Sequence, residues 1–167
     1  SLHDALPIWW RNQNSLLPIL HGQTLGLIGL GQIGSKVAKV AMAFGMKVLT
    51  WSPHMTAERA AAVGAQSVTL DELLQQSNFV SLHIVASETT KGLINQQKLA
   101  LMRQDAILIN TSRGILVDTE ALVSALHNHQ IAGAAVDVYD IEPMPSDHPL
   151  RKTPNTLITP HLGFVSI

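Results

Sequence analysis

Residues 24–34, TLGLIGLGQIG, constrain the fold more than any other part of the sequence. A short, largely apolar run ends in three glycines, Gly29, Gly31 and Gly34, and apolar residues at helical spacing follow them. A short apolar run suits a strand that is buried on both faces. The sequence therefore predicts a strand, a tight glycine turn and a helix in immediate succession.

Each glycine of this turn has a separate physical reason to lack a side chain. Gly29 permits the tight turn, Gly31 lets a pyrophosphate approach the backbone, and Gly34 lets the helix pack closely on the strand. The amides of Gln32 and Ile33 would then face the phosphates from the helix N-terminus, where a partial positive charge lies. The strand before the turn and the helix after it favour dinucleotide binding over a purely structural glycine turn.

Strands and helices are expected to alternate along nearly the whole chain. Further strands are expected at 46–51, 79–83, 106–110, 132–138 and 155–159, and helices at 35–45, 56–63, 69–76, 95–102 and 119–129. Thr69 with Glu72 predicts a capping box, and Asn95 and Asp118 are expected N-caps. This alternation predicts an α/β fold, a Rossmann-type, doubly wound, mostly parallel sheet with helices on both faces. Ligands of such sheets bind beyond the carboxyl ends of the strands.

Composition removes several classes of function. Lysine and arginine total 11 against 12 acidic residues and form no basic block, so no nucleic-acid partner is expected. The chain has no cysteine, which removes disulfides and thiolate metal sites, and no apolar run reaches the roughly 18 residues of a membrane span. His3, His21, His127, His129 and His148 have no metal-ligand spacing. We expect no metal, no membrane partner and a cytoplasmic location.

The first residues are a separate case. Residues 2–8 can be encoded by CTACACGACGCTCTTCCGATC, a common DNA-sequencing adapter, although an ordinary loop is the alternative. We therefore expect residues 1–20 to be adapter-derived residues plus a partial linker. Residues 21–167 are expected to form the dinucleotide-binding domain.

Polar side chains directly follow one of the expected buried strands. Thr111, Ser112 and Arg113 come straight after AILIN. A guanidinium at the mouth of a buried strand could clamp a carboxylate with two parallel hydrogen bonds. The alternative is a surface arginine whose stem packs on its own loop.

Two later strands also end in ionisable groups. Asp137, Asp140 and Glu142 follow AAV, and His161 follows LITP. Acidic residues at a strand end are often solvated loop residues, and a lone histidine is more often structural than catalytic. Because these groups and Arg113 end three different parallel strands, their coincidence favours a common site over three independent surface features.

Together, GLIGLGQIG, LINTSRG, AAVDVYDIEP and TPHLG resemble the D-2-hydroxyacid dehydrogenases, over residues 21 to about 165. The resemblance implies that Arg113 binds a 2-oxoacid carboxylate and polarises the carbonyl. It implies that His161 is the acid/base, that Glu142 is its partner, and that the cofactor is NAD or NADP. Imidazole, with an ordinary pKa of about 6.5, suits this proton transfer.

The same resemblance implies the contacts of the nicotinamide. Asp137 would contact its amide, and Thr111 with the backbone around Val85 would line its side. Further cofactor contacts are expected from Thr89, Ser112, Arg113, His161 and Gly163. Residues 83–91 lack the proline that the family normally carries near Val85, and His83 is expected to stabilise this loop rather than do chemistry.

The ribose end of the site departs from the family pattern. Ser52 stands where the family usually has an acidic residue that holds the ribose. A carboxylate there would repel the 2′-phosphate of NADP, so the absence of that acid permits NADP. His54 and Arg59 are near enough in sequence to reach a 2′-phosphate. Pro53, however, occupies the position directly after the strand where the NADP users of the family commonly have an arginine. NAD and NADP both stay open.

The whole protein is expected to have a substrate domain that this chain lacks, so the chain alone should have little turnover. A homodimer is expected for the full-length form. One alternative function is a dinucleotide-sensing, corepressor-like regulator on the same fold, and another is a formate or phosphite dehydrogenase. Glyoxylate, hydroxypyruvate and phosphoglycerate chemistry all stay open.

Overall fold

A computed structural model describes residues 19–163. Most of residues 1–20, which were expected to be adapter-derived residues and a partial linker, therefore lie outside the described residues. Seven strands form one sheet: β1 (Thr24–Ile28), β2 (Lys47–Trp51), β3 (Gln66–Ser67), β4 (Phe79–Leu82), β5 (Ile107–Asn110), β6 (Gly133–Val136) and β7 (Thr156–Ile158). Their order is β3-β2-β1-β4-β5-β6-β7, and every ladder between them is parallel. The expected α/β fold with a doubly wound parallel sheet is confirmed.

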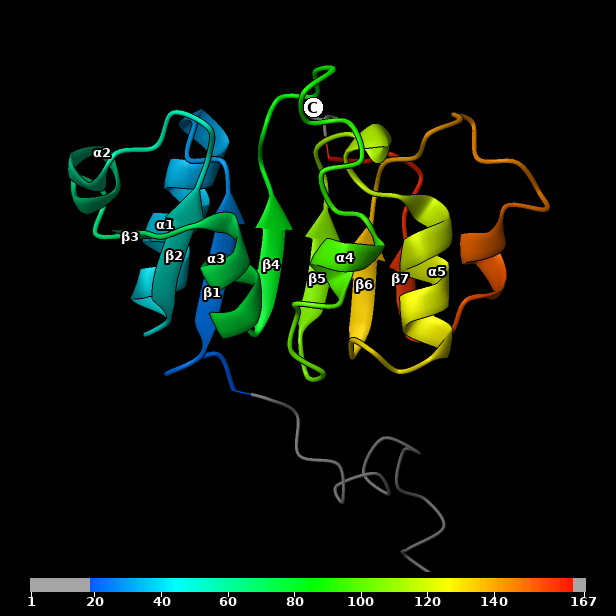
Figure 1. Ribbon diagram of the computed structural model, residues 1–167, viewed down its shortest axis with the longest axis horizontal. Helices are drawn as coiled ribbons and strands as arrows, with labels where there is room; N and C mark the ends of the chain where they lie inside the picture. Colours follow the sequence, from blue (N-terminus) through cyan, green and yellow to red (C-terminus); the bar gives the residue numbers. More distant parts are fainter. Residues whose placement is uncertain (1–18, 164–167) are drawn as a thin grey trace, which may run out of the picture.

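Helices cover both faces of this sheet. They are α1 (Gln32–Ala43), α2 (Ala57–Ala61), α3 (Leu70–Gln76), α4 (Gln96–Leu99) and α5 (Thr119–His127), with 3-10 turns η3 (Gly114–Leu116) and η4 (Pro149–Lys152). Figure 1 shows α3, α4 and α5 in front of the sheet and α1 behind it. Two buried clusters match this division, one that includes Leu73, Leu99 and Leu126 and one around Ala38 and Ala41. The core therefore has two apolar layers, one on each face of the sheet.

The helix caps follow the sequence closely. Thr69 N–H donates to Glu72 Oε2 at 2.9 Å, and Glu72 N–H donates back to Thr69 Oγ1 at 3.2 Å. Asn95 and Asp118 cap α4 and α5 through their side chains. These caps satisfy amides that the first helical turn leaves without partners.

Two helix ends and three short elements differ from expectation. The helix expected to reach residue 102 ends at Leu99, and the helix expected to reach residue 129 ends at His127. Strand β3 was not predicted, because its two residues carry no periodic signal. The 3-10 turns η3 and η4 were not predicted either, because a single turn leaves no helical pattern.

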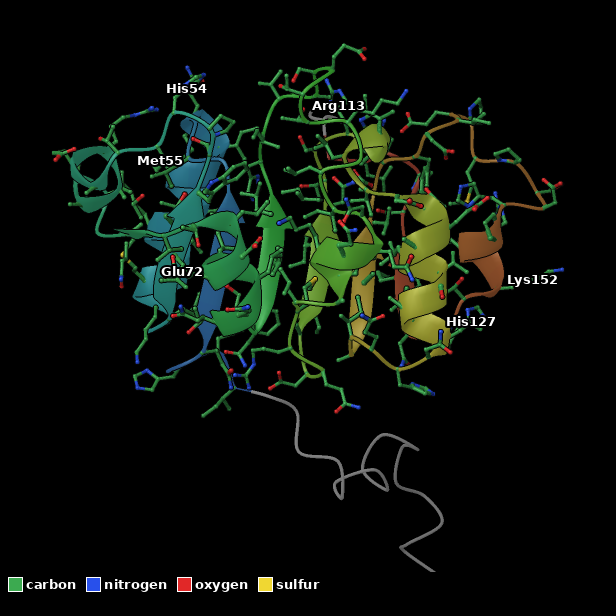
Figure 2. All side chains as sticks on the ribbon, viewed as in Figure 1. His54, Met55, Glu72, Arg113, His127 and Lys152 are labelled. Carbon is green, nitrogen blue, oxygen red and sulfur yellow. The ribbon has the colours of Figure 1, made fainter. Side chains whose placement is uncertain are left out.

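The topology places the site. After β1 the chain moves to β2 on one side and later crosses to β4 on the other, so β1 and β4 flank the switch point of the sheet. Such sheets bind ligands there, beyond the carboxyl ends of the strands. In Figure 2, His54 and Arg113 lie at this end, whereas His127 lies toward the opposite end. No helix within residues 19–163 is long and apolar enough to cross a membrane.

Candidate active site

The glycine turn lies at the end of β1, and its backbone is packed tightly on two sides. Gly29 has φ +102°, and a Cβ there would lie 2.6 Å from the His83 carbonyl oxygen. A Cβ on Gly34 would lie 2.4 Å from the Gly29 carbonyl oxygen. Gly29 N–H also donates to the Trp51 carbonyl at 2.8 Å, which ties the turn to the end of β2. Side chains are excluded at both glycines by contact with backbone.

Gly31 differs from its two neighbours in the motif. A Cβ built on it would meet nothing within 4 Å, so the space beside it is open. Gly31 is also the N-cap of α1, and no side chain caps this helix. The first amides of α1, from Gln32 and Ile33, therefore stand at an open helix N-terminus, which suits a pyrophosphate. The residues present fit a dinucleotide.

The loop after β2 carries the expected ribose-side residues. Ser52 is half-buried, His54 and Arg59 are exposed, and no acidic residue stands at the end of the strand. The Arg59 guanidinium donates through Nη1 to the His54 carbonyl oxygen at 2.8 Å. This bond keeps a positive charge on the loop that follows Ser52.

The loop after β4 is held by Thr90, which is buried. Its hydroxyl donates to the Val85 carbonyl at 2.9 Å and accepts from Ser87 N–H at 2.8 Å. Val85 and Thr89 are left exposed on this loop. His83, at the start of this loop, is hydrogen-bonded through Nε2 to Ser81 Oγ at 2.9 Å. Burial lowers the pKa of His83.

The loop that carries Arg113 is fixed by Asn110, the last residue of β5. The Asn110 side chain, buried in the sheet, donates to the Arg113 carbonyl at 2.9 Å and accepts from Ser112 N–H at 3.1 Å. Ser112 Oγ donates to the Ile84 carbonyl at 2.8 Å, which joins this loop to the one after β4. Thr111 and Arg113 are exposed beside it.

The Arg113 loop also touches the loop that leaves β6. A Cβ on Gly114 would lie 2.1 Å from the Tyr139 carbonyl carbon and 2.4 Å from Asp140 N. Only glycine permits this approach. The hydrogen bond with His161 is the main reason that the pKa of Glu142 is lowered, and the charge of Arg113 adds a smaller contribution.

Glu142 and His161 form the closest ionisable pair of the site. His161 Nδ1 lies 2.6 Å from Glu142 Oε2, and Tyr139 N–H donates to the other oxygen, Oε1, at 2.9 Å. The hydrogen bond with His161, followed by the one from Tyr139 N–H, holds the pKa of Glu142 below its ordinary value. The carboxylate is therefore ionised at neutral pH, in position to fix the orientation of the imidazole.

Asp137 is buried and holds the turn around His161. It accepts a short hydrogen bond from Thr159 Oγ1, and its two oxygens accept from Leu162 N–H and Gly163 N–H, each at 2.8 Å. Burial raises the pKa of this carboxyl, but these hydrogen bonds outweigh burial and leave the pKa below its ordinary value. His161 has φ +53°, a left-handed conformation that residues other than glycine rarely adopt.

A hollow of about 690 Å³ opens beside the histidine and the glutamate. It is lined by Tyr139, Glu142, Pro143, Met144, Arg151, Pro160 and His161. The arginine of this lining, Arg151, donates to the carbonyls of Pro145 and Met144, at 2.8 and 3.1 Å. Among residues 19–163 no group of three histidine or acidic side chains could hold a metal ion.

The structure brings the predicted residues to one edge of the sheet from separate loops. Glu142 and His161 are in contact, and Arg113 and Asp137 lie on the loops beside them. Sequence reasoning missed three residues that hold these loops, namely Asn110, Tyr139 and Thr159. Asn110 could have been found as a polar residue that ends an apolar strand, and Tyr139 as the chain's single tyrosine, two residues after Asp137.

A glycine turn at the switch point of a parallel sheet defines a Rossmann-type dinucleotide-binding domain. The family model "D-isomer specific 2-hydroxyacid dehydrogenase, NAD binding domain" matches residues 6–163. The chain belongs to this family, and the expected cofactor, NAD or NADP, is confirmed at the level of the family.

Individual relatives agree with this assignment. The chain is 41% identical over 159 residues to a glyoxylate reductase from Aeropyrum pernix, covering 92% of this chain and 48% of that protein. It superposes with a TM-score of 0.85 on a putative D-3-phosphoglycerate dehydrogenase oxidoreductase from Ralstonia solanacearum, at 39% identity over 89% of this chain and 44% of that one.

A third comparison is with an NAD-complexed structure. The D-isomer specific 2-hydroxyacid dehydrogenase from Lactobacillus delbrueckii ssp. bulgaricus matches with a TM-score of 0.82 and 34% identity, over 92% of this chain and 50% of that one. The chain thus spans about half the length of these three proteins.

Proposed function

We propose that the chain is the nucleotide-binding part of an enzyme that transfers a hydride between NAD(P)H and a 2-oxoacid or D-2-hydroxyacid. The observation that carries the proposal is the 2.6 Å contact between His161 Nδ1 and Glu142 Oε2, at the edge where the glycine turn also lies. A carboxylate bonded to one ring nitrogen fixes the orientation of an imidazole that exchanges a proton with substrate. Glyoxylate, hydroxypyruvate and phosphoglycerate chemistry are all compatible with this site.

The cofactor would be held along the edge from β2 to β7. Gly29, Gly31 and Gly34, with the amides of Gln32 and Ile33, would hold the pyrophosphate, which the open space beside Gly31 supports. The bound reduced nicotinamide would supply the hydride. Its contacts would come from Val85, Thr89, Thr111, Ser112, Arg113, Asp137, His161 and Gly163.

Asp137 can take part in this contact while it holds the turn. An ionised carboxylate has about four acceptor positions, and three are used by Thr159, Leu162 and Gly163. One position is left for the amide of the nicotinamide.

The ribose would lie beside Ser52. Its hydroxyl would replace the usual acid, and Arg59, held over the loop through His54, would meet a 2′-phosphate. Both NAD and NADP are consistent with this arrangement.

The substrate would be held and protonated by the chain's own residues. Arg113 would clamp the carboxylate of a 2-oxoacid with parallel hydrogen bonds and polarise its carbonyl. His161 would give a proton to the carbonyl oxygen in reduction and take it back in oxidation. Glu142 would hold the ring orientation and favour the protonated imidazole.

The remaining proposals concern the whole protein. Residues 21–167 would form the dinucleotide-binding domain, and a separate substrate domain would close over Arg113 and His161. The exposed apolar side chains of Ile33 and Val40 on α1, and of Phe44 at its C-cap, support a homodimer. A cytoplasmic location and the lack of nucleic-acid and membrane partners stay predictions.

The test is hydride transfer by the full-length protein with a panel of 2-oxoacids. The reaction is monitored through the absorbance of NADH and, separately, of NADPH. The proposal predicts turnover with at least one acid, a loss of at least about 100-fold in kcat for His161→Gln, and a raised KM for Arg113→Gln. Tight nucleotide binding without any turnover would favour the corepressor-like alternative.

A further inference from the structure

The turn that carries His161 is held by more than its contact with Glu142. The carbonyl oxygen of Thr159 accepts from His161 N–H at 3.1 Å, within the turn itself. The Tyr139 hydroxyl lies 2.6 Å from the same carbonyl and 3.0 Å from the carbonyl of Val136, and its single proton is donated along the shorter contact, to Thr159. A side chain from the loop after β6 therefore fixes the acceptor to which the histidine backbone is bonded.

Asp137 holds the turn from the other side. Its carboxylate accepts from the hydroxyl of Thr159, before the histidine, and from the amides of Leu162 and Gly163, after it. The left-handed backbone of His161, at φ +53°, is thus enclosed between two sets of hydrogen bonds. Such a conformation persists only where the surroundings fix it.

The Tyr139 ring is itself fixed in place. It is 9% exposed and packs edge-on against His148, with ring centroids 5.8 Å apart and planes at 71°. His148 Nδ1 accepts from Leu150 N–H at 3.3 Å, so Nε2 carries the proton and donates to Asp140 at 3.3 Å. Burial is the main reason that the pKa of Tyr139 is raised, so its hydroxyl keeps the proton it donates.

We propose that Tyr139 and Thr159 are positioning residues that, with Asp137, set the place of the His161 imidazole against Glu142. Tyr139 acts at both members of the pair, since its backbone N–H holds Glu142 Oε1 and its hydroxyl holds the His161 turn. The inference rests on the proposed function for its meaning in catalysis. Its structural content is independent of turnover.

The test uses a signal that reports the pair directly. The Nδ1–H proton of a histidine bonded to a carboxylate at 2.6 Å should give a downfield proton resonance that exchanges slowly with water. The variants are Tyr139→Phe, which keeps the ring, and Thr159→Val, which keeps the shape of the side chain. Thr159→Ser retains the hydroxyl and should retain the signal.

The matched control is Thr153→Val. Thr153 is buried at the end of η4, and its hydroxyl donates to the Pro149 carbonyl at 3.0 Å rather than to the His161 turn. This variant removes one buried hydrogen bond of the same kind. It should lower the melting temperature to a similar degree and leave the downfield resonance in place.

The expected result is loss or at least about 10-fold faster exchange of the resonance in Tyr139→Phe and Thr159→Val, but not in Thr159→Ser or Thr153→Val. In an active full-length enzyme, kcat should fall while the KM for cofactor stays within about 2-fold. Unchanged exchange in Tyr139→Phe and Thr159→Val would overturn the proposal, and so would equal loss in Thr153→Val. A normal wild-type resonance without turnover on any 2-oxoacid would instead count against the proposed function alone.

Discussion

At the scale of single residues, the Glu142–His161 pair makes the most direct prediction about pH. The hydrogen bond with His161 lowers the pKa of Glu142, and in the proposed reduction an ionised Glu142 would favour the protonated imidazole. In Glu142→Gln this stabilisation is lost. We therefore predict that the pH above which 2-oxoacid reduction slows is lower in this variant than in the wild type. The measurement is the pH profile of kcat/KM for reduction, and an unchanged profile removes Glu142 from this role.

Asp137 makes a prediction about acid stability. Its pKa in the folded chain is below the ordinary 3.8, so its ionised form stabilises the fold above that pH. The contribution is lost as the pH falls below 3.8 and through the folded pKa. Asp137→Asn should therefore lower the free energy of unfolding by about 2 kcal/mol at neutral pH, and the difference should narrow in acid.

Denaturant unfolding at several pH values checks the Asp137 prediction. Asp147→Asn, on the exposed loop before η4, is the control and should stay within about 0.5 kcal/mol of wild type. A gap for Asp137→Asn that stays constant down to the lowest pH would show that the carboxylate charge is not what stabilises the turn.

At the scale of elements, the glycines of the turn between β1 and α1 are predicted to differ in role, one serving stability and another nucleotide binding. Gly34→Ala places a Cβ 2.4 Å from a backbone oxygen, whereas Gly31→Ala places one in open space. Gly34→Ala should cost about 1–3 kcal/mol of stability. Gly31→Ala should cost less than about 1 kcal/mol but weaken NADH binding at least about 10-fold, because its methyl lies where the pyrophosphate would approach.

Thermal melts and NADH titrations of both variants check the glycine prediction. Equal loss of stability in both would mean that Gly31 is structural. Unchanged NADH affinity in Gly31→Ala would place the cofactor away from this turn.

Helices could be predicted from the sequence where a cap marks their start, and strands where a short apolar run marks them. The α3 capping box and the apolar strands β1, β4 and β5 follow local rules that tertiary contacts did not override. β3 depends on its pairing with β2, and each 3-10 element is a single turn, so no periodic pattern in the sequence reports them.

The same division applies to the candidate site. Arg113, Glu142 and His161 could be predicted as candidates because each follows an expected strand and carries an ionisable side chain. The holding residues Asn110, Tyr139 and Thr159 act through bonds to backbone atoms of other loops, such as the 2.6 Å bond from Tyr139 to Thr159. Those partners are fixed only by the fold.

At the scale of the whole molecule, the parallel sheet explains why separate loops form one site. All seven strands run in the same direction, so their carboxyl ends share an edge (Figure 1). The glycine turn, the loop with Arg113 and the turn with His161 therefore meet there, although more than a hundred residues separate the first from the last. The dinucleotide would run along this edge.

One measurement tests that account most directly. The backbone carbonyl of Trp51, at the end of β2, accepts from Gly29 N–H, so this residue lies next to the glycine turn, and its side chain is half-buried. We expect its fluorescence to respond to a bound nucleotide once Trp9 and Trp10 are replaced by phenylalanine. Titration with NADH and, separately, NADPH should give a saturable change in Trp51 fluorescence with at least one of them, and the preferred one reveals how the ribose is held near Ser52. No saturable change with either nucleotide would contradict dinucleotide binding at this edge of the sheet.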